Sequence, residues 1–196
     1  MIIFPGNELP GRLLLFVRGV MSTHCLPSKL VILINAVCFQ LVWWAGVLAH
    51  NQLILLSILL LICHFLLSKS VRHDALVMCV CGAIGITVDS LLVWFGVFKF
   101  DNMPYWLGLL WLYFALCLDY SLALFRKFPL LLQAILGGIF GCLSYLAGAK
   151  FDAVMLPLGE VWSGLILVLI WSCLFPVLLM ISSRITTVDL ALEDGR

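Results

Sequence analysis

The 196-residue chain is 64% hydrophobic and carries only eleven Lys and Arg with ten Asp and Glu. A soluble domain has about 25% charged residues, whereas this chain has 11%, too few to cover a soluble core. The composition therefore predicts an integral membrane protein. The net charge of +1 supplies no basic field for phosphate groups, which argues against nucleic-acid binding.

Six apolar runs approach the roughly 20 residues that an α-helix needs to cross a hydrocarbon core of about 30 Å. They cover residues 30–48, 53–67, 75–98, 105–125, 130–149 and 161–181. We therefore expect an all-α fold, a polytopic bundle of about six transmembrane helices within residues 30–182. Few residues separate the first two runs, which predicts an antiparallel hairpin of neighbouring helices.

The distribution of basic residues predicts the orientation of this bundle. With both termini in the cytoplasm, all the Lys and Arg except Lys99 and Lys150 lie on the cytoplasmic side, as positively charged loops prefer. Residues 1–29, broken by Pro5, Pro10 and Pro27, are expected to form a cytoplasmic or interfacial arm. Residues 183–196 are expected to form a cytoplasmic tail.

Several polar residues within the apolar runs are candidates for a pocket. An Asp at the centre of a membrane helix costs roughly 2.5–3.5 kcal/mol, so Asp89 is either a structural contact between helices or a lumen-facing ligand or proton carrier. Asn35, Gln40 and Trp43 in the first run either bridge helices or form a polar pocket wall. Together with Tyr145, these residues are the predicted ligand or pocket residues.

His64 and Asp119 are candidates for a proton relay. Both are expected near the cytoplasmic end of the bundle, where a His and Asp pair can transfer protons if the helices adjoin. The alternatives are a hydrated interfacial His64 and an Asp119 that is solvated or paired with Arg126. The sequence shows no spacing typical of a hydrolase triad.

The fifth run has a face of small residues at steps of four, three and four: Gly137, Gly141, Ser144 and Gly148. Such a face favours close helix packing, or alternatively backbone exposure to a ligand. Seven of the eight cysteines lie in apolar runs, where they are expected to pack as small hydrophobic residues. No metal site and no cofactor are expected, because no Cys or His pair has zinc-site spacing and no cofactor motif occurs.

Four segments carry a resemblance to a known family: "NAVCFQLVWW" from Asn35, "VDSLLVWFGVFKF" from Val88, "PYWLGLLWLYFAL" from Pro104 and "GGIFGCLSYLAGAKFDAV" from Gly137. The chain resembles the bacterial inner-membrane family called domain of unknown function 2878, over roughly residues 30–181. The resemblance implies several membrane spans, localisation in the bacterial inner (cytoplasmic) membrane and no established activity. It also implies a lipid-related role by association, because such proteins are often encoded near fatty-acyl-modifying enzymes.

Three functions are consistent with these features. The first is a multi-pass membrane protein whose polar pocket binds or moves a small amphipathic molecule such as a lipid. The second is a membrane-embedded lipid-modifying enzyme, which is less favoured because no nucleophile stands beside a base. The third is an accessory subunit whose small-residue face contacts a membrane partner or a second copy of the chain.

Overall fold

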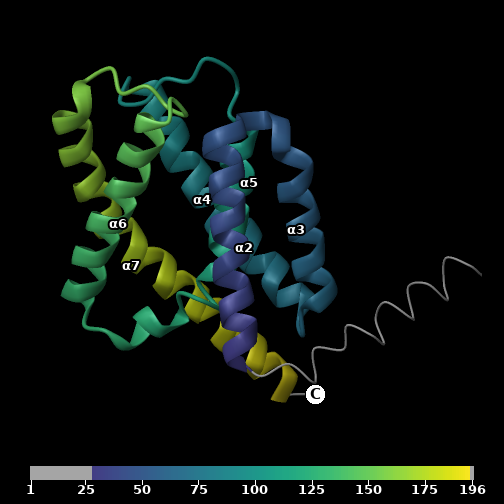
Figure 1. Ribbon diagram of the computed structural model, residues 1–196. Coiled ribbons are helices and arrows are strands. Elements are labelled where there is room, and N and C mark those ends of the chain that lie inside the picture. The colour runs from purple at the N-terminus through teal and green to yellow at the C-terminus, as the bar shows by residue number, and fades with distance from the viewer. Residues whose placement is uncertain (1–27, 195–196) are drawn as a thin grey trace, which may run out of the picture.

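The structure, a computed structural model, describes residues 28–194, with side chains described for residues 29–186. All regular structure in this range is helical, which confirms the predicted all-α class (Figure 1). The elements are α2 (Ser28–Ala49), the 3₁₀ helix η2 (His50–Leu53), α3 (Ile54–Leu67), α4 (Val71–Trp94), α5 (Tyr105–Cys117), the 3₁₀ helix η3 (Ala123–Lys127), α6 (Leu130–Lys150) and α7 (Gly159–Asp194). The predicted arm at residues 1–29 lies almost entirely outside the described residues.

Four stretches of the described chain are long and apolar enough to cross a membrane: Lys29–Leu67, Val71–Trp94, Leu130–Lys150 and Gly159–Thr186. The first stretch contains both α2 and α3, which η2 joins into the predicted antiparallel hairpin (Figure 1). A long row of apolar side chains faces outward on these helices, with Leu55 76% and Leu169 70% exposed. Such a surface is compatible with a membrane protein, because lipid tails can cover it.

Helix α5 is the central helix of the bundle and packs against α2, α3 and α4. Its buried side chains include Trp106, Trp111 and Tyr113. The side chain of Asn51 in η2 accepts a hydrogen bond from the backbone N–H of Trp106 at 3.1 Å and donates one to the carbonyl of Met103 at 2.9 Å. These bonds fix the start of α5 against the α2–α3 hairpin.

The predicted helix over residues 105–125 is wrong after Cys117, where α5 ends. Polar side chains of other helices hold the following turn. The amide oxygen of Asn35 accepts hydrogen bonds from the backbone N–H and the hydroxyl of Ser121, at 3.2 and 2.7 Å, and the hydroxyl of Tyr120 donates to Asp74. At 13 residues, α5 is about 20 Å long, shorter than a hydrocarbon core.

The predicted run over residues 75–98 also shifts, because α4 spans Val71–Trp94. Gly96 follows with a positive φ of 73°, a conformation that glycine adopts without steric cost and that ends the helix. Beyond it, Lys99 and Met155 exchange backbone hydrogen bonds at 3.0 and 2.8 Å. These bonds join the α4–α5 connection to the α6–α7 connection.

Two members of the small-residue face of α6, Gly137 and Gly141, lie against α7. A Cβ atom at Gly137 would meet Phe175, and one at Gly141 would meet the ring of Trp171. Glycine is therefore required for the close approach of these two helices, which run side by side on one flank of the bundle (Figure 1). Helix α7 is longer than its predicted run and continues to Asp194.

Candidate functional site

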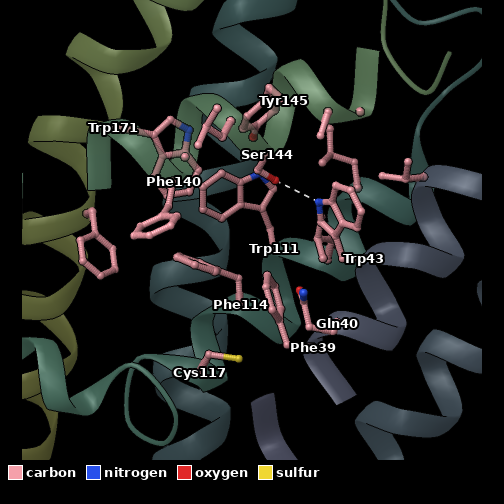
Figure 2. Close-up of a pocket in the computed structure, with 18 of the residues that line it drawn as sticks. Phe39, Gln40, Trp43, Trp111, Phe114, Cys117, Phe140, Ser144, Tyr145 and Trp171 are labelled. Atoms are coloured by element: carbon pink, nitrogen blue, oxygen red, sulfur yellow. Dashed lines mark hydrogen bonds between the residues drawn. The ribbon is translucent and has the colours of Figure 1, made fainter. Parts of the chain in front are cut away.

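A cavity of about 760 Å³ lies between α2 and α6. Helix α2 supplies one wall and α6 the opposite wall, while α7 supplies Phe175. Trp111 and Phe114 of α5 and Trp171 of α7, labelled in Figure 2, complete the lining. The two wall helices stand apart in Figure 1, with α4 visible between them. The cavity is thus built from four helices that are distant in the sequence.

Aromatic side chains dominate the cavity wall. Trp111 stacks on Trp171 with ring centroids 5.4 Å apart and an angle of 8° between the ring planes. Phe114 meets the same Trp171 edge to face at 5.6 Å. This arrangement gives the cavity a rigid and largely apolar interior, since such pairs restrict one another's rotation.

The side of the cavity between α2 and α6 carries exposed apolar residues. Trp44 on α2 is 42% exposed, and Phe140 and Leu143 on α6 are 63% and 54% exposed. These residues form the mouth of the cavity. An apolar mouth on an apolar helix surface favours entry of a ligand from a lipid phase rather than from water.

A hydrogen bond connects the two walls of the cavity. The indole Nε1–H of Trp43 on α2 donates to the hydroxyl of Ser144 on α6 at 2.9 Å, as the dashed line in Figure 2 shows. Ser144, predicted as a packing residue, therefore also belongs to the cavity wall. Trp43, one of the predicted pocket residues, lines the cavity.

Gln40 also lines the cavity, and in Figure 2 its exposed side chain lies beside Phe39 and below Trp43. Within the part of the chain that the structure describes, its amide makes no hydrogen bond to another residue. The indole N–H of Trp171 likewise has no partner there. The cavity therefore presents uncharged donors and an acceptor that a bound molecule can use.

Asp89 lies behind the cavity wall rather than on it. Its side chain is 5% exposed and accepts hydrogen bonds from Trp111 Nε1 at 2.6 Å and from the Tyr145 hydroxyl at 2.8 Å. Both donors line the cavity, and Phe98 stacks on the ring of Tyr145 at 4.8 Å. Asp89 therefore orients two aromatic wall residues and supports the wall from outside the cavity.

Asn35 lies at the edge of this site. It is 3% exposed, and its oxygen holds Ser121, which lines the cavity. Its amide nitrogen has no hydrogen-bond partner among the residues that the structure describes. Asn35 thus fixes the turn that follows α5, and this turn closes one end of the cavity.

His64 and Asp119 do not contact each other. His64 Nε2 instead lies 3.0 Å from Asp74 Oδ2, an oxygen that also accepts a hydrogen bond from Tyr120. Asp119 contacts His73 at 2.8 Å and forms an ion pair with Arg126, which is one of its predicted alternatives. The structure therefore contains two His and Asp pairs at this end of the bundle, separate from the residues that line the cavity.

Sequence reasoning missed several residues that shape these sites. Trp111 and Trp171 stand in apolar runs and carry no signal beyond their size, so only the fold shows that they form the cavity. Asp74 and His73 precede the predicted start of the third run at residue 75, and they were assigned to a connection. A helix N-terminus placed four residues earlier would have brought both into the bundle.

No group of three or more His, Cys, Asp or Glu side chains suited to a metal ion occurs among the described residues. The cavity wall carries no Asp, Glu, Lys, Arg or His in the described range. The site can hold a molecule by apolar contact and a few uncharged hydrogen bonds.

The fold and the cavity define an all-helical protein with membrane-type helices around an aromatic pocket. The chain belongs to the family described as "Protein of unknown function (DUF2878)", whose family model matches residues 32–177. This match confirms the resemblance found in the sequence. The search of curated proteins and the search of solved structures found no match.

Proposed function

We propose that this chain is a multi-pass protein of the bacterial inner membrane that binds or moves a lipid or another small amphipathic molecule in the cavity between α2 and α6. The observation that carries this proposal is the aromatic cavity itself, which opens between two apolar helices. Its volume of about 760 Å³ lies within the roughly 300–1,000 Å³ of small-molecule pockets.

The position of the mouth supports a ligand from the bilayer. The mouth residues Trp44, Phe140 and Leu143 continue the outward-facing apolar surface of α2 and α6. A lipid tail can therefore enter sideways without leaving an apolar environment.

Binding is favoured over catalysis by the residues of the wall. The two His and Asp pairs lie away from the lining residues, and both oxygens of Asp89 accept hydrogen bonds from wall residues. No lining side chain in the described range is a base next to a nucleophile. These features support a binding or transfer role over a lipid-modifying reaction.

The proposed orientation has six spans, α2 to α7, with both termini in the cytoplasm. Alternation of the helices supports it, because Lys69 and Arg126 fall in connections at one end of the bundle, while Lys99 and Lys150 fall at the other (Figure 1). The turn and η3 follow α5 directly and lengthen this segment of the chain. This supports counting the short helix α5 as a span.

The proposal is tested by filling the cavity. Ala36 on α2 lines it, whereas the adjacent Val37 is 49% exposed and does not. We expect the purified wild-type protein and Val37→Phe to retain bound lipid in native mass spectrometry, and Ala36→Phe to lose it. Equal lipid retention by the two variants would contradict a role for this cavity, and a wild-type protein that retains no lipid would do so as well.

A further inference from the structure

The cavity offers polar groups but no charge. Gln40, Ser121, Ser144 and Tyr145 are among its polar lining residues, and no lining side chain in the described range is acidic or basic. A charged head group placed there would lose its hydration without meeting a counter-ion, which is strongly unfavourable in an apolar environment. An uncharged head group loses far less and can form hydrogen bonds.

Three of the charged side chains near the site bond to other residues of the protein. Asp89 accepts hydrogen bonds from Trp111 and Tyr145, and Arg126 pairs with Asp119 and donates to Ser182 at 2.7 Å. Lys150 contacts Glu160 at 2.5 Å. None of these contacts leaves a cation directed into the cavity to bind a phosphate or a carboxylate.

Gln40 provides the hydrogen bonds that such a head group needs. Its amide can donate and accept at once, and within the described residues no neighbour uses either capacity. It lies on the same helix as the mouth residue Trp44, four positions away and therefore on the same helix face. Gln40 is itself exposed, so its amide lies at the mouth of the cavity, one helical turn along α2 from Trp44.

We infer that the ligand class of this cavity is a long-chain lipid with an uncharged hydroxyl or ester head group, held at the head by Gln40 and along the chain by the aromatic wall. This inference rests on the proposed function, because it names the ligand of the same cavity. It commits the site to neutral lipids and excludes anionic lipids as preferred ligands.

The experiment compares two lipids that differ only in an anionic phosphate group, a monoacylglycerol and its phosphate ester, both with the same dibrominated acyl chain. Bromine quenches tryptophan fluorescence on contact, and five of the seven tryptophans line the cavity: Trp43, Trp44, Trp106, Trp111 and Trp171. Titrations use the full chain in an uncharged detergent at neutral pH. We expect the monoacylglycerol to quench with at least ~10-fold higher affinity than the phosphate ester.

Variants connect this preference to Gln40. In Gln40→Leu we expect the affinity for the monoacylglycerol to fall about 2- to 10-fold, as loss of one neutral hydrogen bond predicts. Gln52→Leu, which changes a glutamine of η2 outside the cavity, should bind as the wild type does. Unchanged affinity in Gln40→Leu would overturn the role of Gln40.

The two failures are distinguishable. Equal or tighter binding of the phosphate ester would overturn the neutral-lipid inference while leaving lipid binding intact. If neither lipid quenches more strongly in the wild type than in Ala36→Phe, the proposed function fails, and the inference fails with it.

Discussion

Asp89 illustrates how a single buried carboxylate can serve a binding site without touching the ligand. It accepts hydrogen bonds from Trp111 and Tyr145, and it thereby holds two rings in the cavity wall. Because an unpaired acid in hydrocarbon is costly, the sequence predicted for this residue either a structural contact between helices or a lumen-facing role as a ligand or proton carrier. It did not reveal the partners, since neither Trp111 nor Tyr145 is close to Asp89 in the chain.

Removal of this carboxylate should destabilise the protein. Asp89→Leu leaves the indole N–H of Trp111 and the hydroxyl of Tyr145 buried without an acceptor. We expect the free energy of unfolding to fall by about 1–3 kcal/mol, measured by denaturant unfolding in detergent. The matched control is Ser90→Leu, because Ser90 is exposed and bonds only its own helix backbone. A loss in Ser90→Leu as large as that in Asp89→Leu would contradict this account of Asp89.

At the scale of the elements, the sequence predicted the long helices and the small-residue face of α6. The reason is that apolar length and glycine spacing are local properties of the chain. The end of α5 at Cys117 was not predictable in this way. It depends on Asn35 and Asp74, which lie on α2 and α4 and hold the turn after α5 through Ser121 and Tyr120.

The close contact of α6 with α7 predicts opposite effects of two glycine substitutions. Gly141→Ala places a methyl group against Trp171, and overpacking of this kind costs about 1–3 kcal/mol. At Gly108 in α5, no atom lies within 4 Å of an added Cβ. Gly108→Ala should therefore stabilise its helix by about 0.5–1 kcal/mol. Thermal unfolding in detergent should therefore show a lower Tm for the first variant and an unchanged or higher Tm for the second. A lower Tm for both variants would mean that the α6–α7 contact is not the cause of the destabilisation by Gly141→Ala.

For the whole molecule, the alternation of helices brings the connections with Lys69 and Arg126 to one end and those with Lys99 and Lys150 to the other. We expect fusions after Lys69 and Lys127 to be active with a cytoplasmic reporter, and fusions after Lys99 and Lys150 to be active with a periplasmic reporter. A periplasmic signal at Lys69 or Lys127 would reverse the proposed orientation. If the same reporter were active after both Lys99 and Lys127, these two sites would lie on the same side of the membrane, and α5 would not be a span.

The cavity itself is a property of the whole molecule, because its wall combines residues of α2, α5, α6 and α7. The sequence supplied Gln40, Trp43 and Tyr145 as pocket candidates from their polarity, and the structure places all three on the cavity wall. Most of the wall is aromatic and apolar. Such residues cannot be told from ordinary packing residues until the fold brings them together.

The most direct test of a lipid-binding cavity is photolabelling with a neutral lipid that carries a photoreactive group at the end of its acyl chain, followed by mass mapping of the labelled residues. Phe114 and Trp171 line the cavity from α5 and α7, while Leu55 and Leu59 are exposed on α3 outside it. We predict saturable labelling of Phe114, Trp171 or their cavity neighbours, which Ala36→Phe abolishes. Labelling confined to outward-facing residues such as Leu55 and Leu59 would contradict the account.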